Sequence, residues 1–380
     1  MKKLNELQSV ELDILKEFSH AAKAHGLSWF AMFGTLLGAV RYGGFIPWDG
    51  DIDIALPRID YDRLRHNPDW FTEPYFLQTP YNDPAAAPRF TRLRRSDTTN
   101  LYGFNTYLTR GGNMGAYIDI IPLDDVPNGA AAHNMQETVM KINDQMLASA
   151  ALDECYGIPF PIEKENFCFG AGGVAGLYPM LAERYEKFCS KYTDNLYYAM
   201  PVLAGERGCR VYDKEWFRET AEMNFEDIKI PAPTGWKEVL IASFPEGTYE
   251  LDLKYRKAKH TQKCVVDMSR SYKEYVRRYT DMLCEIENKQ VFIFGAGDSL
   301  RIWLERYGKG LKVICAFDNS KSKWRNKSYG VTIRNPAELP ELLNDNSRLI
   351  IASIHHEEIS KQLENMGISD YYIFIDGLRY

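Results

Sequence analysis

Residues 44–58 have the sequence GFIPWDGDIDIALPR. From Asp51 to Leu56 polar and apolar residues alternate, which is the period of a strand that is buried on one face. Asp49, Asp51 and Asp53 occupy alternate positions, so they share a face, with neighbours roughly 6–7 Å apart along an extended chain. Three like charges on one face repel each other, and a divalent cation such as Mg²⁺ between them makes the arrangement favourable. The pattern therefore predicts a metal site on a strand.

The residues on either side of this stretch distinguish two interpretations of the aspartates. They form a metal site, or they only solvate the end of an edge strand. Gly34 and Thr35 precede a predicted helix start, where backbone N–H groups suit a phosphate. A second predicted strand, residues 116–122, carries Asp119 between two isoleucines as a third carboxylate. Four arginines lie between the two strands, in RFTRLRRSDTTN: Arg89, Arg92, Arg94 and Arg95. Together these flanks favour the metal site.

Bulk composition limits the classes of partner. The chain has 380 residues, which is enough for two domains with separate cores. Its formal charge of −6 gives no general attraction for nucleic acid, so we expect no nucleic-acid partner. No apolar run approaches the length of a transmembrane segment, and the start of the chain reads as an amphipathic helix rather than a signal sequence. We therefore expect a cytoplasmic protein.

The remaining elements follow from periodicity and from turn residues. Apolar residues recur at helical spacing over residues 7–24, and Gly26 ends that helix. A short strand is predicted at residues 27–33, before the turn at Gly34 and Thr35. Residues 128–200 have a largely helical character, interrupted by the glycine-rich piece 170–178. A long polar helix covers residues 272–287.

Composition changes near Lys289, where KQVFIFGAGDSL predicts a buried strand, a glycine turn and a helix. Further apolar strands at VICAFDNS, RLIIASI and YYIFID predict a small doubly wound sheet in residues 288–380, after a first domain of residues 1–287. Gly295 and Gly297 suit a nucleotide-binding turn, and Asp318 lies where a ribose-binding acid is expected. Leu300 replaces the third glycine, so packing of helix against strand remains the alternative.

The segment WFAMFGTLLGAVRYGGFIPWDGDIDIALPRIDYDRL, residues 29–64, resembles the LicD family of phosphorylcholine transferases. This family includes the fukutin-type enzymes and has a nucleotidyltransferase-like fold. RLRRSDTTN resembles the basic segment of the family, YIDIIPLD its third-carboxylate segment, and FEDIKIPAPTGWKEVL its C-terminal signature, so the resemblance covers about residues 5 to 245. The chain departs from the family pattern at Gly50, which replaces an aspartate, and at Phe33, which replaces a glycine.

The resemblance implies an α/β fold in two parts, an α+β nucleotidyltransferase-like domain and the doubly wound domain. It implies Asp51, Asp53 and Asp119 as ligands of Mg²⁺ or Mn²⁺, with Asp49 as a helper. Gly34, Thr35, Arg41, Arg92 and Arg94 are the expected phosphate contacts, and Trp48 or Trp29 would meet a choline group. Structural salt bridges are the alternative for each arginine, and core packing for each tryptophan.

The implied reaction moves a phosphorylcholine-type group from a CDP-linked donor, typically CDP-choline, to a hydroxyl of a cell-surface glycan or its lipid-linked precursor. Lipopolysaccharide and teichoic acid are glycans of this kind, and CMP is the expected product. Two other functions stay open. One is nucleotidyl transfer with release of pyrophosphate, and the other is a nucleotide-sensing protein with a degenerate N-terminal half.

Overall fold

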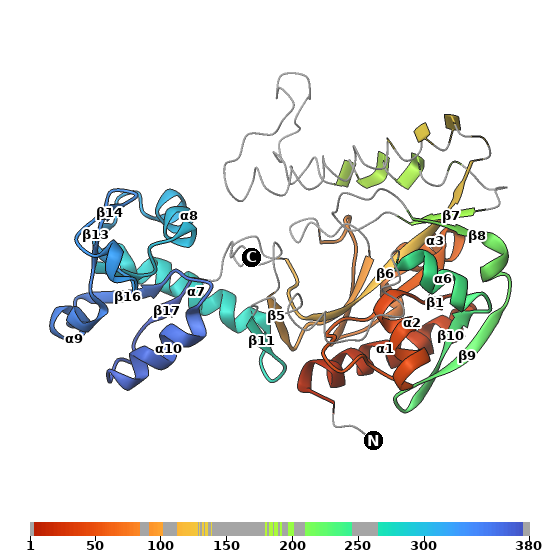
Figure 1. Ribbon diagram of the computed structural model, residues 1–380, viewed down its shortest axis with the longest axis horizontal. Helices are drawn as coiled ribbons and strands as arrows, with labels where there is room; N and C mark the ends of the chain where they lie inside the picture. Colours follow the sequence, from red (N-terminus) through yellow and green to blue (C-terminus); the bar gives the residue numbers. More distant parts are fainter. Residues whose placement is uncertain are drawn as a thin grey trace. The chain divides into compact units, whose positions relative to one another are not determined.

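The computed structural model describes residues 4–83, 91–101, 112–127, 197–200, 210–244 and 265–374, together with isolated residues between 129 and 191. The chain divides into two compact units, and both combine helices with a sheet, which confirms the predicted α/β class (Figure 1). The first unit holds residues 1–100, 113–261 and 266–270, and the second holds residues 101–112, 262–265 and 271–380. The helix at 272–286, which the sequence analysis placed in the first domain, therefore groups with the second unit.

The first unit begins with α1 (Glu6–His25), as predicted. The Asn5 side chain accepts a hydrogen bond from the backbone N–H of Gln8, and the Gln8 side chain accepts one from the backbone N–H of Asn5. This reciprocal cap fixes the start of the helix. Gly26, at φ 60°, ends the helix in a left-handed conformation that glycine adopts without strain.

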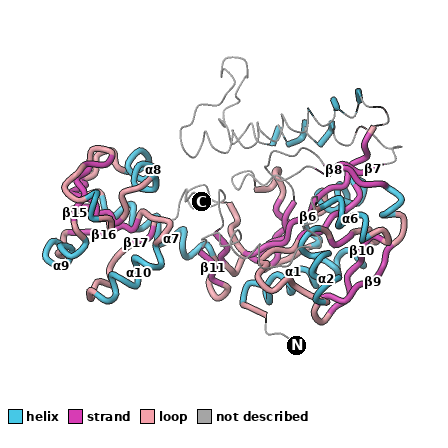
Figure 2. Tube along the Cα trace, viewed as in Figure 1, coloured by secondary structure: helices cyan, strands magenta, loops and turns pink. Residues whose placement is uncertain are grey.

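A mixed sheet forms the centre of this unit (Figure 2). Seven strands of the described chain take part, with the main path β1-β2-β6-β4-β3 and with β7 and β8 beyond β6. Their bounds are β1 (Phe30–Ala31), β2 (Asp53–Pro57), β3 (Tyr75–Gln78), β4 (Thr91–Arg95), β6 (Ala116–Val126), β7 (Tyr197–Met200) and β8 (Arg210–Asp213). The pair β2 and β6 is parallel, and the other strand pairs described in this sheet are antiparallel. The sequence analysis ended this strand at residue 122, but β6 continues to Val126.

Strand alternation gives the sheet an apolar face and a polar face. The apolar face carries Ile54, Leu77, Leu93, Ile118 and Ile120, all fully or almost fully buried. Two helices cover it. The hydroxyl of Tyr75 donates to Asp13 of α1 at 2.7 Å, and the hydroxyl of Tyr61 on α3 (Arg58–Arg65) accepts from the backbone N–H of Thr91 at 3.0 Å. The opposite, polar face carries Asp53 of β2, Arg92 of β4 and Asp119 of β6.

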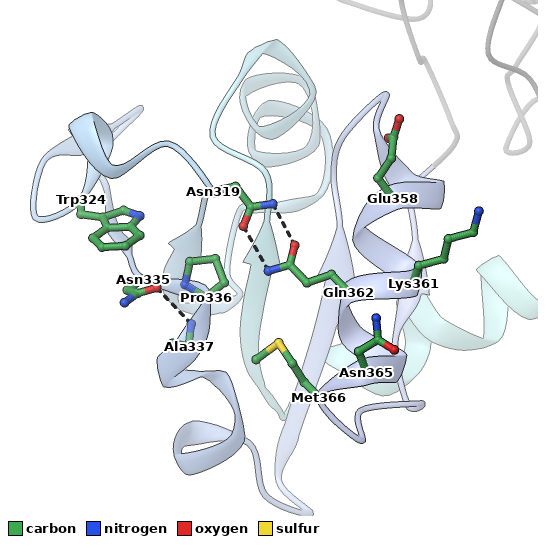
Figure 3. Close-up of a pocket in the computed structure, with 10 residues that line it drawn as sticks. All are labelled: Asn319, Trp324, Asn335, Pro336, Ala337, Glu358, Lys361, Gln362, Asn365 and Met366. Atoms are coloured by element: carbon green, nitrogen blue, oxygen red, sulfur yellow. Dashed lines mark hydrogen bonds between the residues drawn. The ribbon is translucent and has the colours of Figure 1, made fainter.

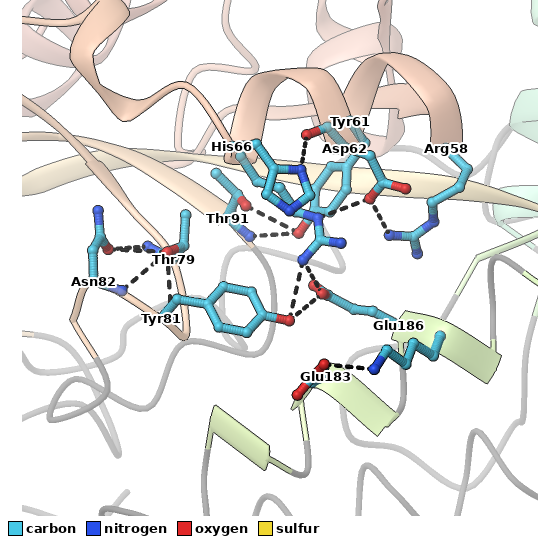
Figure 4. A network of polar contacts seen from close by, with 12 residues as sticks. Arg58, Tyr61, Asp62, His66, Thr79, Tyr81, Asn82, Thr91, Glu183 and Glu186 are labelled. Carbon is cyan, nitrogen blue, oxygen red and sulfur yellow. Dashed lines mark hydrogen bonds and ion pairs between the residues drawn. The ribbon is translucent and has the colours of Figure 1, made fainter.

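A polar network holds α3 on the sheet (Figure 4). The guanidinium of Arg58 binds the fully buried carboxylate of Asp124 through two hydrogen bonds, of 2.6 and 2.9 Å. This ion pair explains why a charged residue is tolerated inside β6. Arg65 and the hydroxyl of Tyr81 both donate to Glu186, which belongs to a helical stretch whose described residues fall within 179–188.

A hairpin of β9 (Thr220–Phe225) and β10 (Ile228–Pro233), followed by α6 (Trp236–Ser243), completes the described part of the first unit. Its tip residue Glu226 donates its backbone N–H to the carbonyl of Gly43 at 2.7 Å and accepts from the N–H of Phe45 at 3.0 Å. A Cβ atom on Gly44 would lie 2.0 Å from the Glu226 carboxylate, so glycine lets this side chain approach the turn. The hairpin thus fixes the turn that leads into residues 44–58.

The second unit contains a sheet of order β14-β15-β13-β12-β16-β17 within its described residues. The bounds are β12 (Gln290–Phe294), β13 (Lys312–Phe317), β14 (Lys327–Ser328), β15 (Val331–Arg334), β16 (Ser347–Ile351) and β17 (Tyr372–Ile373). All pairs are parallel except that of β14 with β15. The parallel strands thus follow the order 3-2-1-4-5, which is that of a doubly wound sheet. The sequence analysis did not predict β14 or β15, because both are too short to show a period.

The helices of this unit are α7 (Tyr272–Ile286), α8 (Asp298–Tyr307), α9 (Leu339–Leu342) and α10 (His356–Asn365). A two-stranded sheet pairs β5 (Thr99–Leu101) with β11 (Val265–Asp267). The predicted glycine-rich piece at 170–178 lies outside the described residues. Within the described residues, no helix is both long enough and apolar enough to span a membrane.

Candidate active site

One level of the polar face brings together four side chains that lie far apart in the sequence. Asp53 of β2 is the direct partner of Asp119 on β6, Asp119 is the partner of Arg92 on β4, and Arg92 is the partner of Gln78 on β3. Cross-strand partners point to the same face of a sheet. Asp53 and Asp119 are 8% and 7% exposed. The predicted third carboxylate thus lies beside the Asp-x-Asp segment.

The aspartates of residues 49–53 and Asp119 act strongly on one another. Burial, followed by the charges of Asp119 and Asp49, raises the pKa of Asp53 well above its usual range, and Arg92 opposes this shift. The pKa of Asp51 is also raised, first by the loss of water around its carboxyl group and then by Asp53 and Asp49. Asp51 still exposes part of its surface. A bound cation would offset the charge repulsion at Asp51 and so oppose this rise in its pKa.

Arg92 is the cation of this cluster. Its Nε donates to Oδ1 of Asp119 at 2.7 Å, and its guanidinium lies 4.3 Å from the ring centre of Tyr117. Both side chains of the ion pair are about nine-tenths buried, at 11% and 10% exposure. Arg92 is therefore held beside Asp119 and against the ring of Tyr117.

Arg94, the other arginine predicted on β4 as a phosphate contact, is only 2% exposed. Its Nε donates to Oε1 of Gln78 at 2.6 Å and its Nη1 donates to the carbonyl of Gly115 at 2.5 Å. Burial and the neighbouring Arg92 lower the pKa of this guanidinium to about 10. These contacts lie within the sheet, so they favour a structural role for Arg94 rather than phosphate contact.

Gly34 and Thr35 lie in the first turn of α2 (Phe33–Tyr42), and the expected turn before the helix is absent from this described stretch. The Oγ1 atom of Thr35 accepts the backbone N–H of Asp53 at 2.9 Å, which ties the helix start to the metal strand. A Cβ atom on Gly34 would lie 2.5 Å from Oδ2 of Asp49, so glycine lets this carboxylate approach the helix. No side chain of the described chain caps the helix start, which leaves it suited to an anion.

Phe33 is the first residue of α2 and has φ 45°. This left-handed conformation is strained for a residue with a side chain and is the one that glycine adopts freely. The resemblance expects glycine at this position. The backbone at Phe33 therefore has a conformation that suits the expected glycine, while its phenyl ring is partly buried against the core.

Three residues that were predicted to contact the substrate are not placed beside the aspartates by the described structure. Arg41 lies seven residues beyond Gly34, so its Cα is about 10 Å further along the α2 axis. Trp48 is partly buried against the core. Trp29 is 5% exposed and packs edge-on against Phe18 at a ring distance of 5.4 Å. For both tryptophans the core-packing alternative is the better description.

Two residues of α1 that the sequence analysis did not identify lie against the acidic segment. Nε2 of Gln8 donates to the backbone carbonyl of Asp49 at 2.9 Å. One turn later, Glu11 is 1% exposed, and its pKa is raised well above its usual range by burial and then by the charge of Asp51. Glu11 precedes Leu15 and Phe18 at helical spacing, so a charge on the apolar side of the helix was a detectable signal.

The donor set has the chemistry of a site for a hard divalent cation. Within the described chain, no group of three or more His, Cys, Asp or Glu side chains is arranged to hold a metal ion by itself. Mg²⁺ does not require one, because it is commonly bound by one or two carboxylates, several waters and the phosphates of the substrate. Oε2 of Glu11 is a buried oxygen without a hydrogen-bond partner among the described residues, next to aspartates that repel it. A cation would satisfy both features.

The predicted nucleotide turn of the second unit has a structural explanation. Gly295 has φ 125°, and a Cβ atom there would lie 2.1 Å from the carbonyl oxygen of Ala352. Glycine is thus required for the end of β12 to approach the end of β16. A Cβ atom on Gly297 would meet open space. Asp318 accepts hydrogen bonds from the N–H of Ser320 and from Nζ of Lys323, both at 2.8 Å, so its carboxylate is held within its own turn.

The cavity drawn in Figure 3 lies elsewhere in this unit, between the turns after β13 and β15 and helix α10. Its volume is about 560 Å³. Asn319 and Gln362 face each other across it through two amide hydrogen bonds, of 2.8 and 3.1 Å. Gly295, Gly297 and Asp318 are not among the residues that line it. This cavity is thus separate from the predicted nucleotide turn.

Comparison with known proteins agrees with this geometry. Residues 26–125 match the family model of the LicD/FKTN/FKRP nucleotidyltransferase domain, and residues 287–374 match the C2185-like N-terminal domain. Over 134 residues the chain is 34% identical to the lipopolysaccharide cholinephosphotransferase LicD of Haemophilus influenzae. The aligned part is 34% of this chain and 48% of that protein, so the chain spans about half the length of this curated relative. Residues 26–125 are therefore similar to a nucleotidyltransferase domain of the LicD type.

Proposed function

We propose that the chain is a metal-dependent phosphotransferase that moves a phosphorylcholine-type group from a CDP-linked donor to a hydroxyl of a cell-surface glycan. The observation that carries the proposal is the polar level of the sheet, where Asp53 and Asp119 are direct neighbours and Arg92 lies beside them. Carboxylates with an adjacent guanidinium suit the binding of a metal–diphosphate complex. The similarity to the lipopolysaccharide cholinephosphotransferase of Haemophilus influenzae supports choline phosphate as the transferred group and lipopolysaccharide as the acceptor.

Asp51 and Asp53, with Asp119 beside them, would hold the cation, which is Mg²⁺ or Mn²⁺. When bound, the cation neutralises charge on the diphosphate and lowers the pKa of the attacking hydroxyl. Arg92 contacts phosphate oxygens next to Asp119. The start of α2 binds the diphosphate through its backbone N–H groups, and the hydroxyl of Thr35, which accepts from Asp53, directs its hydrogen to a phosphate oxygen.

In the proposed reaction, the acceptor hydroxyl oxygen forms a bond to the phosphorus that carries choline. The bond from this phosphorus to the bridging oxygen breaks, and that oxygen leaves as part of CMP. The carboxylate of Asp119 accepts the proton of the attacking hydroxyl. Its direct neighbour Arg92 holds the carboxylate in place through the Nε contact of 2.7 Å.

The test is product analysis with the full-length chain, Mg²⁺, CDP-choline labelled in the choline methyl groups, and lipopolysaccharide that lacks choline. We expect label in the lipopolysaccharide and an equal amount of CMP, both abolished by EDTA and by Asp53→Asn. A parallel reaction with labelled CTP measures pyrophosphate. Release of pyrophosphate without label transfer from CDP-choline would instead establish a nucleotidyltransferase, and binding of nucleotide without turnover would establish a sensor.

A further inference from the structure

Tyr117 is a buried aromatic residue on the polar face of the sheet, next to the residues of the proposed site. It lies on β6 two residues before Asp119, so both side chains point to the same face. Its direct partner on β4 is Arg94, just as Arg92 is the partner of Asp119. Tyr117 is 9% exposed. The ring therefore fills the level of the polar face that adjoins Asp119 and Arg92.

Two guanidinium groups lie close to the ring of Tyr117. The Cζ atom of Arg92 is 4.3 Å from the ring centre, and the Cζ atom of Arg94 is 4.5 Å from it. A cation within about 6 Å of a ring centre is attracted by the electrons of the ring, and more strongly where water is excluded. Arg92 and Arg94 occupy alternate positions of one strand, so they share a face and repel each other. The ring offsets this repulsion because it attracts both.

The two arginines are held in different ways. Arg94 is 2% exposed, and it donates one hydrogen bond of 2.6 Å to Gln78 and one of 2.5 Å to a backbone carbonyl. This guanidinium and the ring of Tyr117 are therefore both enclosed in the sheet. Arg92 contacts that ring and also donates through Nε to Oδ1 of Asp119 at 2.7 Å. The position of the Arg92 guanidinium is thus set by Asp119 and by the ring together.

We propose that Tyr117 is a positioning residue, whose ring holds the guanidinium of Arg92 ready for a phosphate of the CDP-linked donor. This inference rests on the proposed function, which assigns Arg92 to phosphate oxygens. An arginine side chain loses much rotamer freedom when it is ordered, and a residue that orders it before the ligand binds removes that cost from binding. The contacts with both arginines are made by the ring, so they do not require the hydroxyl of Tyr117.

The test measures donor binding rather than turnover. Isothermal titration calorimetry gives the Kd of CDP-choline for the full-length chain in Mg²⁺, without an acceptor. We expect Tyr117→Leu to weaken binding about 10-fold, because Arg92 must then be ordered by the ligand itself. Tyr117→Phe keeps the ring, so its Kd should stay within about twofold of that of the unmodified chain.

Tyr75→Leu is the matched control. Tyr75 belongs to the same sheet, and its ring also contacts a guanidinium, that of Arg95 at 5.8 Å. It lies on the opposite face, because it alternates with Phe76, the partner of Arg94. Tyr75→Leu therefore removes the same ring and the same kind of contact away from the site, and its Kd for CDP-choline should equal that of the unmodified chain.

A double-mutant cycle separates positioning from a merely structural role. If Tyr117 acts through Arg92, Tyr117→Leu should change the Kd little when Arg92→Gln is already present, whereas a general loss of packing would weaken both backgrounds equally. All values are taken below the melting temperature of each variant. If Tyr117→Leu does not fold, Tyr117→Met gives the same comparison, because its flexible apolar side chain fills the space without a ring.

Three results would overturn the inference: a Kd of Tyr117→Leu equal to that of Tyr75→Leu, an equal loss of affinity in the Arg92→Gln background, or no recovery of affinity in Tyr117→Phe. The proposed function fails separately. An unmodified chain that binds CDP-choline but transfers no label would overturn the proposed function alone, because the Kd values still decide the role of Tyr117. An unmodified chain that binds no CDP-choline would overturn both.

Discussion

Asp53 and Asp119 are direct cross-strand partners on the parallel strands β2 and β6, although 65 residues of chain lie between them. The parallel pairing places both carboxylates on one face and at one level, where each raises the charge density around the other. In the antiparallel partner strand, Arg92 lies at the same level. The site is therefore a property of the strand order, and the first prediction tests its two acidic members.

Asp53→Asn and Asp119→Asn should each reduce choline-phosphate transfer on the order of 10³-fold, because each removes a charge that holds the cation. Both should also melt at a higher temperature than the unmodified chain in EDTA, since each relieves repulsion within the cluster. Label transfer measures the first effect and calorimetry the second. A variant that transfers label at a near-normal rate would remove its aspartate from the metal site.

Arg92→Lys and Arg94→Lys form a matched pair on one strand. Arg92→Lys should keep the fold but lower kcat/KM for the CDP-linked donor about 10- to 100-fold, because lysine cannot contact Asp119 and a phosphate with the same geometry. Arg94→Lys should leave hydrogen-bond acceptors of Gln78 and Gly115 unpaired and lower the free energy of unfolding by roughly 2–3 kcal/mol. Urea unfolding and steady-state kinetics on both proteins check this. The reverse pattern would assign phosphate contact to Arg94.

The stability of the metal-free protein should depend on pH in a defined direction. The folded-state pKa values of Asp51, Asp53 and Glu11 are raised, so the folded state binds more protons than the unfolded state. Their contribution to stability is fully present below their unfolded pKa values and is lost as the pH rises through the folded ones. In EDTA, the excess melting temperature of Asp53→Asn over the unmodified chain should therefore grow from about pH 5 to pH 8. Saturating Mg²⁺ should stabilise the unmodified chain most at the upper end of that range.

At position 33, alanine and glycine variants should show the reverse of their usual order of stability in a helix. In a helix glycine is normally the less stable of the two, by roughly 0.5–1 kcal/mol. At φ 45° the alanine side chain is strained and glycine is not. Phe33→Gly should therefore have a larger free energy of unfolding than Phe33→Ala, by about 1 kcal/mol. Comparing these two variants removes the contribution of the phenyl ring, and equal stability in urea would show that the backbone is not strained there.

Gly295→Ala and Gly297→Ala should differ sharply although the two glycines are only two residues apart. A methyl group at Gly295 would meet the carbonyl of Ala352 in a backbone conformation that already favours glycine. We expect it to destabilise the second unit by more than about 2 kcal/mol, whereas Gly297→Ala should change little. Limited proteolysis of residues 271–374 measures this. If the glycine turn serves packing, neither variant should change the KM of the CDP-linked donor, and a raised KM in Gly297→Ala would instead support nucleotide binding there.

Local patterns were enough to predict the elements whose period is long or whose ends carry turn residues. The helix that ends at Gly26 is confirmed, as are the strands at 290–294 and 347–351. The strand predicted over residues 51–56 begins only at Asp53, so Asp49 and Asp51 precede β2 and the prediction that all three aspartates share a strand face is wrong. The same patterns placed Asp49, Asp51 and Asp53 on one segment. They failed where a short range of sequence carries no period, as for β15. They also ended the strand at residue 122, whereas β6 continues through Asp124, which is buried against Arg58.

The alternation of charge and aliphatic side chain in residues 51–56 is a local property, and it was therefore visible in the sequence as a candidate metal segment. Which other residues join that segment depends on strand order and helix packing, which are non-local. Only the fold distinguishes Arg92, beside Asp119, from Arg94, enclosed by Gln78 and Gly115. Only the fold shows that burial, and then the charge of Asp51, raises the pKa of Glu11, because the packing of α1 is non-local.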